Sequence, residues 1–439
     1  MVGAIAHPIA EEKPSGQRAF DRCRLLGVPP FSGRADGLDR RYLTAAHAAT
    51  LGQVAAWMED AGMTTRLDPL ATLIGRYEGT EPGAPALMIG SHIDSVPNGG
   101  VFDGPLGVML GIEVVARLHE AGTRYPFPIE VVAFGDEEGS RFNASMMASR
   151  AIAGTSIVSS LQQTDAQGIE VSAALSAFDA LLAEHGNLAR DQRPPAEAAR
   201  GPDIAAFVEA HIEQGPVLEA EGLALGVVTA IAGQLRYAIE VCGSAAHAGT
   251  TTMGLRSDAL AGAAAMVSAA EEVARAEAEN GVVATVGRLE TFPGGSNVIP
   301  GRVHFSLDVR APSNDMRDAA ARAIEERFGA IAEERGLTLS IDQQQDLSAT
   351  PCDPGLIALL AQAVSSVDDR AFELFSGAGH DAMSVAALCP VTMLFVRCER
   401  GISHHPDENI LPEDAEQALQ ALLEFTRLYE GHRHAASVR

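Results

Sequence analysis

Apolar residues recur along the chain with two spacings, and these predict alternating strands and helices. Residues 86–91 and 129–134 are continuous apolar runs, which are typical of buried strands, and helical spacing predicts helices over 39–62 and 106–118. Strand–helix–strand order with uniformly apolar strands favours a largely parallel sheet covered by helices. The pattern returns near the C-terminus, where helices are expected over 356–366 and 413–429 around a strand at 391–397.

From residue 223 the pattern changes to β-α-β-β-α-β, the ferredoxin-like arrangement. The expected strands are 235–242, 282–289, 303–310 and 337–342, and the expected helices are 257–279 and 314–335. Ser313 is the expected N-cap of the second helix. We therefore predict an α/β fold with a helix-covered mixed sheet, formed by residues 1–222 and 343–439 and interrupted by a smaller α+β domain over 223–342.

The length of the chain agrees with two domains, and its net charge excludes some classes of binding partner. The chain has 439 residues, more than one hydrophobic core usually serves, and a formal net charge of −26. This charge repels phosphate backbones and anionic lipids, so we expect no nucleic acid and no membrane partner. No apolar run approaches the ~20 residues that span a bilayer.

The five cysteines indicate the compartment. They are odd in number, scattered, and without a C-x-x-C pair: Cys23, Cys242, Cys352, Cys389 and Cys398. Such spacing indicates reduced thiols instead of a disulfide framework, so we expect a cytoplasmic protein.

Polar residues follow the predicted strands of the first domain. His92 and Asp94 come after strand 86–91, Asp103 opens the next helix, and Glu137 and Glu138 come after strand 129–134. Sites in such sheets form beyond the carboxyl ends of the strands. Two adjacent glutamates there are unfavourable unless a cation or a proton neutralises them.

His211, in HIEQGP, and His404, in GISHHPDE, complete a set that could hold two divalent cations. Such a pair polarises a carbonyl and lowers the pKa of water, and a spare carboxylate then serves as general base. Each piece also has a structural interpretation: the His-x-Asp as a polar turn, the acidic run as a solvated loop, His211 as a core histidine, and His404 with His405 as a loop cap. Their joint occurrence favours the metal site.

Eight ordered motifs carry a resemblance to a known family. They are SHIDSVPNGGVFDGPLGV, GDEEGSRF, HIEQGPVLE, HAGTTTM, SNVIPG, DVR, SGAGHDAM and GISHHPDE. Together they resemble the amidase branch of the M20 metallopeptidase superfamily, which contains N-carbamoyl-L-amino acid, allantoate and ureidoglycolate amidohydrolases and β-ureidopropionases. The resemblance implies a di-metal catalytic domain with an inserted dimerisation or lid domain, and hence a homodimer.

The resemblance also implies a role for each residue of the metal set. The implied ligands are His92 and His211 for one ion, Glu138 and His404 for the other, and Asp103 as the bridge between them. Asp94 would orient the ring of His92, and Glu137 would be the general base. Between the adjacent histidines the residues alone do not decide; the resemblance selects His404.

The remaining implied residues would contact substrate. His247, in HAGTT, resembles a histidine that reaches across a dimer to stabilise the oxyanion, and Arg310 resembles the arginine that binds the substrate carboxylate. The other implied contacts are Gln214, Arg236, Asn297 and Gly379. The sequence departs from the family pattern at Thr252, which stands where HAGTTPM has proline, so the local geometry beside His247 is open.

The predicted activity is therefore hydrolysis of the carbamoyl or ureido C–N bond of an N-carbamoyl-L-amino acid or similar small ureido acid, releasing ammonia and carbon dioxide. Imidazole and carboxylate ligands without thiolate suit Zn²⁺, Mn²⁺, Co²⁺ or Ni²⁺, and of these we expect Zn²⁺ first and Mn²⁺ second. The rival interpretations are an allantoate or ureidoglycolate amidohydrolase, an M20 dipeptidase or aminoacylase, and a non-catalytic homologue.

Overall fold

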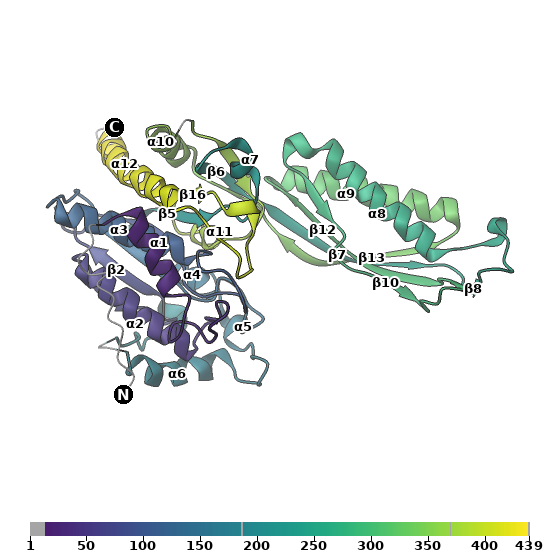
Figure 1. Ribbon diagram of the computed structural model, residues 1–439, viewed down its shortest axis with the longest axis horizontal. Helices are drawn as coiled ribbons and strands as arrows, with labels where there is room; N and C mark the ends of the chain where they lie inside the picture. The colour runs from purple at the N-terminus through teal and green to yellow at the C-terminus, as the bar shows by residue number, and fades with distance from the viewer. Residues whose placement is uncertain (1–13, 186–187, 369, 438–439) are drawn as a thin grey trace. The chain divides into compact units, whose positions relative to one another are not determined.

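The structure, a computed structural model, describes residues 14–185, 188–368 and 370–437, and its α/β class, with a mixed sheet, is as predicted (Figure 1). Contacts divide the chain into two compact units. Unit 1 runs to Thr229 and includes Cys352–Leu374 and the chain from His380, whereas unit 2 consists of Ala230–Pro351 and Phe375–Gly379. Both divisions lie beyond the expected ones at 222 and 342.

The core sheet of unit 1 has the strand order β1-β2-β4-β3-β5-β16-β6, and β14 and β15 also pair with β6. The bounds are β1 Thr64–Leu67, β2 Leu73–Tyr77, β3 Ala86–His92, β4 Ile129–Phe134, β5 Ile204–Ile212, β6 Leu225–Ile231, β14 Thr350–Pro351, β15 Glu373–Ser376 and β16 Val391–Val396. The four central strands β4, β3, β5 and β16 are parallel, whereas β1, β2 and β6 are antiparallel to their neighbours. The carboxyl ends of the four parallel strands therefore lie at the same edge of the sheet.

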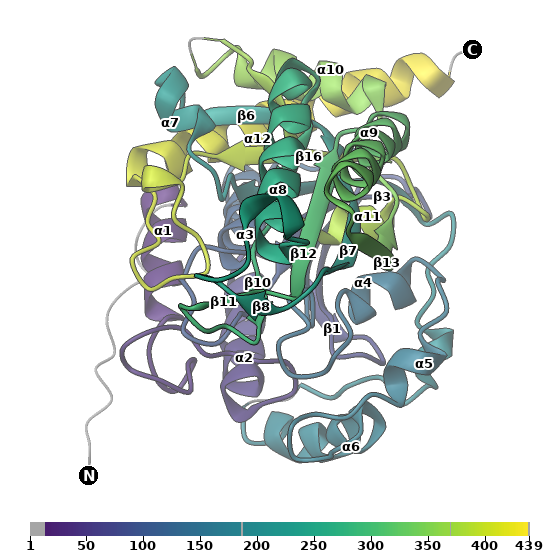
Figure 2. The same cartoon turned by 90° about the vertical axis from the view of Figure 1, so that its right-hand side faces the viewer.

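Helices cover this sheet, which is why β3, β4 and β16 are buried along their whole length. The bounds are α1 Gly16–Leu25, α2 Ala45–Asp60, α3 Pro105–Glu120, α4 Met147–Ile152, α5 Val158–Leu161, α6 Val171–Leu182, α7 Val217–Glu221, α10 Pro354–Val364, α11 Asp381–Val385 and α12 Pro412–Ser437. Helix α3 packs on β3, β4 and β5, and α10 and α12 pack on β16. Figure 2 shows the same elements from the side.

Helix α2 is shorter than the expected 39–62. Its N-cap is Thr44, whose side chain accepts a hydrogen bond from the backbone N–H of His47. Leu43 has a φ of 58°, in the left-handed region, so the preceding residues cannot continue the helix.

Unit 2 has a sheet of order β10-β12-β7-β13, with β9 beside β12. The bounds are β7 Gly233–Cys242, β9 Val283–Thr285, β10 Leu289–Phe292, β12 Arg302–Ala311, β13 Thr338–Leu347, α8 Ala259–Ala276 and α9 Asn314–Arg335. This is the antiparallel strand order of a β-α-β-β-α-β unit, with α8 and α9 over one face (Figure 1). Ser313 caps α9 as expected, accepting from the N–H of Met316.

Alternation along the strands separates the two faces of this sheet. Odd positions of β7 and β12, such as Ile239 and Leu307, are buried in one cluster with side chains of α8 and α9. Even positions lie on the face without helices. A separate two-stranded sheet is formed by β8, Ala246–His247, and β11, Val298–Ile299. Among the described residues, no helix combines the length and apolar character that crossing a membrane requires.

Candidate metal and substrate site

The four parallel strands of unit 1 deliver the predicted metal set to one edge of the sheet. His92 is the last residue of β3, and His211 is the penultimate residue of β5. Glu137 and Glu138 lie in the turn directly after β4, and His404 lies in the loop after β16. Strand order and direction therefore bring together segments that are more than 300 residues apart in sequence.

Asp103 lies at the centre of this cluster, with different histidines facing its two oxygens. Oδ1 is 3.1 Å from Nε2 of His211 and 3.5 Å from Nε2 of His92, whereas Oδ2 is 3.3 Å from Nε2 of His404. Glu138 is 3.7 Å from the same nitrogen of His404. The Asp103 carboxylate thus lies between two groups of potential metal ligands, His92 with His211 on one side and His404 with Glu138 on the other.

The two buried imidazoles present lone pairs toward each other. Nδ1 of His211 is 2.8 Å from the carbonyl oxygen of Ile212, and Nδ1 of His92 is 3.2 Å from that of Asp94, so each Nδ1–H donates there. The Nε2 atoms are then acceptors, yet they lie 3.4 Å apart. A proton or a cation must relieve this repulsion.

Three triads of ligand atoms lie within 4.8 Å of one another: His92 with Asp103 and His211, His92 with Glu137 and Glu138, and Asp103 with Glu138 and His404. Imidazole and carboxylate donors without thiolate suit borderline divalent cations. The residues present therefore fit a metal centre, and the cluster could bind a metal ion.

Asp94 organises both sides of the cluster. Its Oδ1 lies 3.5 Å from Nδ1 of His92 and accepts the backbone N–H of Glu137 at 3.1 Å, and Oδ2 accepts that of Glu138 at 3.3 Å. Asp94 is fully buried. Asp94 therefore contacts the His92 ring through both its carbonyl and its carboxylate, and the carboxylate fixes the turn that carries both glutamates.

The crowding of carboxylates perturbs their protonation. Burial, together with the neighbouring Glu138, raises the pKa of Glu137 well above its ordinary value, although His92 opposes the shift. Burial and the nearby Asp103 raise the pKa of Glu138 to about 7. For Asp103 burial has the same sense, but hydrogen bonds from His211, His404 and His92 outweigh it and hold the pKa well below normal. Strong shifts in a cluster of this kind are typical of functional sites.

The backbone of the site is strained at defined points. Asp136, Gln214 and His404 have φ values of 65°, 58° and 56°, a region that residues other than glycine seldom adopt. Gly104, with a φ of 84°, begins α3 beneath the ring of His92, where an added Cβ would lie 2.4 Å from a ring carbon. The ligand-bearing turns are therefore held in geometries that ordinary loops avoid.

Neighbours of Asp103 were not predicted from the sequence. Ser403 donates to Oδ2 at 2.7 Å, and Glu408 accepts the backbone N–H groups of Phe102 and Asp103 at 2.9 and 3.0 Å. Both residues lie in the quoted motif GISHHPDE, and its glutamate is the sequence feature from which a role beside the site could have been predicted. Gln214, expected to contact substrate, donates to the same Oδ2 at 2.8 Å.

The other expected substrate contacts belong to unit 2 and fall in two places. Arg236 and Arg310 project from β7 and β12 on the face without helices, and both bind Asp308. Arg310 also donates from NH1 to the carbonyl of Gly377 at 2.6 Å, in the loop that contains the exposed Gly379.

His247 and Asn297 lie together elsewhere in unit 2. His247 is in β8 and pairs with Val298 of β11, and the carbonyl of Asn297 accepts the N–H of Ala248 at 2.9 Å. The ring of His247 is exposed, and its Nδ1 accepts from the N–H of Gly249 at 3.1 Å. Thr252, at the departure from the family pattern, is extended, with a φ of −66°, which proline also adopts.

Comparison with known proteins finds similar proteins whose similarity covers nearly the whole chain. The sequence is 41% identical over 408 residues to N-carbamoyl-L-amino acid amidohydrolase of Geobacillus stearothermophilus, covering 93% of this chain and 97% of the relative. It is 38% identical over 429 residues to allantoate deiminase of Arabidopsis thaliana, with 92% and 80% covered.

A solved structure of a hydantoinase/carbamoylase family amidase from Burkholderia ambifaria matches with a TM-score of 0.84 and 34% identity, covering 94% of this chain and 98% of that chain. The model of peptidase family M20/M25/M40 matches residues 88–427, a span that contains every predicted site residue. On this match and these relatives, the chain belongs to peptidase family M20/M25/M40.

Proposed function

We propose that the protein hydrolyses the carbamoyl C–N bond of N-carbamoyl-L-amino acids, giving the amino acid, ammonia and carbon dioxide from one substrate and one water. The observation that carries the proposal is the 41% identity to an N-carbamoyl-L-amino acid amidohydrolase over 93% of the chain. It is supported by the cluster of His92, Asp103 and His211, with Glu137, Glu138 and His404 beside it.

The proposed general base is Glu137. Its turn is fixed by Asp94, and its carboxylate would accept a proton from water and donate that proton to the leaving amine. His92 and His211, Glu138 and His404 would hold two divalent cations bridged by Asp103; such ions, when bound, polarise a carbonyl and lower the pKa of water. We propose Zn²⁺ first and Mn²⁺ second.

The proposed anchor of the substrate carboxylate is Arg310, because a guanidinium binds carboxylates through paired N–H donors. Arg236 shares its partner Asp308, and Gly379 lies in the loop that Arg310 contacts. We propose that Asn297 and Gln214 supply amide contacts, and that His247 stabilises the oxyanion.

We further propose that two copies of the chain complete each site, through unit 2 as a dimerisation and lid domain. Arg310 lies near one end of β12 and Arg302 at the other, a separation of ~26 Å at ordinary strand rise. His247 lies in β8, and Asn297 directly precedes β11, with which β8 pairs. In space, β8 lies at the end of the unit 2 sheet where β12 begins (Figure 1). One small substrate cannot reach both groups within a single copy, so a partner would supply one of them.

Allantoate hydrolysis is the second candidate, since relatives named allantoate deiminase are 36–38% identical over 92% of this chain. Ureidoglycolate hydrolysis, dipeptide hydrolysis and a non-catalytic role are the remaining alternatives. All of the predicted ligands and Glu137 are present, which weighs against the last. We place the enzyme in the cytoplasm, on the basis of its five free cysteines.

Ammonia release from a panel of N-carbamoyl-L-amino acids, allantoate, ureidoglycolate and dipeptides tests the proposal. The protein is stripped of metal and reloaded separately with Zn²⁺, Mn²⁺, Co²⁺ or Ni²⁺. We expect turnover of N-carbamoyl-L-amino acids only after reloading. Cleavage of dipeptides without any ureido compound would refute it, and preference for allantoate would favour the second candidate.

A further inference from the structure

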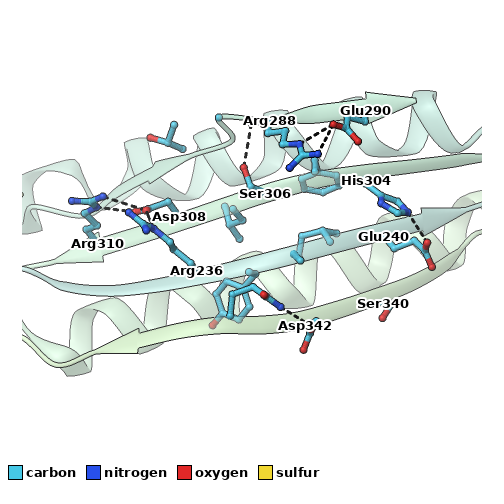
Figure 3. Close-up of a pocket in the computed structure, with 18 of the residues that line it drawn as sticks. Arg236, Glu240, Arg288, Glu290, His304, Ser306, Asp308, Arg310, Ser340 and Asp342 are labelled. Carbon is cyan, nitrogen blue, oxygen red and sulfur yellow. Dashed lines mark hydrogen bonds and ion pairs between the residues drawn. The ribbon is translucent and has the colours of Figure 1, made fainter. Parts of the chain in front are cut away.

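A cavity of about 760 Å³ lies over the sheet of unit 2 on the face without helices (Figure 3). Its polar lining contains two cross-strand pairs of polar side chains between β7 and β12. Arg236 lies opposite Asp308, and Glu240 lies opposite His304, four residues away on each of the two antiparallel strands. The pairs are alike in position but differ in what surrounds them.

The Glu240–His304 pair is a simple contact of 2.7 Å between two partly exposed side chains. Asp308, in contrast, is the centre of a network. Oδ1 accepts Nε of Arg310 at 2.8 Å, and Oδ2 accepts NH2 of Arg310 at 3.2 Å, Nε of Arg236 at 2.8 Å and Nε2 of Gln234 at 2.6 Å. Its side chain is 23% exposed. Figure 3 shows both arginines turned toward Asp308.

This network uses a defined part of the Arg310 guanidinium. Asp308 and Arg310 are two apart on β12 and so share a face, which lets the carboxylate take the edge formed by Nε and NH2. NH1 is engaged by the carbonyl of Gly377 at 2.6 Å. Of the five N–H groups of an arginine, three are thus committed, and the remaining two belong to NH1 and NH2 at the tip.

We propose that Asp308 is a positioning residue that presents the tip of Arg310 to a single substrate carboxylate. The inference rests on the proposed function, because it assigns how the anchor of that substrate is held. Asp308 also offsets one of the two arginine charges, so the group Arg236–Asp308–Arg310 carries one net positive charge. That charge matches the single carboxylate of the proposed N-carbamoyl-L-amino acid substrate.

The test compares Asp308→Asn with Glu240→Gln, a matched loss of one carboxylate on the same sheet face. Substrates are an N-carbamoyl-L-amino acid and the corresponding urea without its carboxylate. We expect Asp308→Asn to raise KM for the acid at least tenfold with little change in kcat, and Glu240→Gln to leave both unchanged. The reaction of the urea should respond to neither variant. An unchanged KM for the acid, or an equal loss with the urea, would refute the proposal.

A double-mutant comparison separates positioning from a general structural effect. If Asp308 acts through Arg310, Asp308→Asn should add no further loss in an Arg310→Ala background. Additive losses would contradict the proposal.

A crystal structure of the Asp308→Asn variant gives a result that does not depend on turnover. We expect the Arg310 side chain to leave its contact with Gly377, and an unmoved Arg310 would overturn the inference. If the wild-type protein cleaves no ureido acid on the panel, the proposed function fails, and this structural result still decides the positioning of Arg310.

Discussion

Glu137 and Glu138 are adjacent in the chain but face different neighbours. Glu138 lies 3.7 Å from His404 and belongs both to the triad with Asp103 and to the triad with His92, whereas Glu137 belongs to the His92 triad alone. Both backbone N–H groups are held by Asp94, so side-chain changes at either position leave the turn anchored. Two isosteric substitutions can therefore test separately the proposed base, Glu137, and the proposed ligand, Glu138.

Glu137→Gln should lower turnover by about 10²–10⁴-fold, the usual contribution of a general base, with metal content retained. Glu138→Gln should instead lower the amount of metal bound. Steady-state rates and elemental analysis of both purified variants check this. Loss of metal in the Glu137→Gln protein would make Glu137 a ligand and remove it from the base role.

Metal binding should release protons and strengthen as pH rises. In the metal-free protein the pKa of Glu138 is about 7, mainly from burial, and hydrogen bonding to Asp103 raises that of His404 to about 9. Cations bind the deprotonated forms, so the apparent affinity should increase through this pH range and level off above it. Titration calorimetry in two buffers of different ionisation enthalpy measures the proton release. An affinity that does not vary with pH would contradict the assignment of these two ligands.

At the scale of the element, the N-terminus of helix α3 lies beside the candidate metal site. Its first turn follows Asp103, and Gly104 leaves room for the His92 ring above it. Gly122, just past the other end of α3, also has a positive φ, 64°, but an added Cβ there meets nothing within 4 Å. A substitution at Gly122 therefore introduces backbone strain alone, whereas one at Gly104 introduces both backbone strain and contact with the site.

Gly104→Ala should destabilise the protein and weaken metal binding, because the methyl group would displace the His92 ring. Gly122→Ala should cost only the left-handed strain, about 1 kcal/mol of unfolding free energy. Denaturation of both variants with and without Zn²⁺ measures the difference. Equal metal-dependent stabilisation in the two proteins would show that the ring tolerates the methyl group.

Elements with strong patterns were predictable from the sequence, and others were not. Strand β4 and helix α9 match their expected ranges because uniform burial and an N-cap mark them. Strand β13 runs to Leu347, beyond the expected 342, because backbone pairing with β7 maintains it through exposed glutamines that carry no apolar signal. The expected strand over 282–289 divides into β9 and β10.

The candidate site follows the same rule. The five predicted ligands and the predicted base could be selected from the sequence because metal chemistry restricts residue types and the motifs preserve their order. Ser403 and Glu408 reach Asp103 and its backbone through hydrogen bonds between distant parts of the chain, and such contacts leave no local spacing in a sequence, whereas Asp308 stands two residues before Arg310 in the quoted DVR motif. The second carboxylate role of Asp94, as acceptor for the glutamate turn, also depends on the pairing of β3 with β4.

At the scale of the whole molecule, the proposed sharing of a site between copies makes a mixing experiment decisive. His247→Ala and Glu137→Gln proteins should each be nearly inactive. Mixed dimers would contain one intact site, so re-equilibrated mixtures should recover about a quarter of wild-type activity by statistical pairing. Glu137→Gln mixed with Glu138→Gln is the control, because each change disables the site of its own chain, so a mixed dimer contains no intact site and should show no recovery. Absence of recovery in the first mixture would place His247 in its own chain's site.

The length of β12 has a consequence for how the protein behaves on dilution. A ten-residue strand holds Arg310 away from the His247 sheet, so if two copies share each site as we propose, a lone copy would lack a complete site whatever its metal content. Specific activity then becomes a function of enzyme concentration by mass action, falling once the chain is more dilute than its self-association constant. A rigid strand in one chain would thus set the lowest abundance at which the enzyme works.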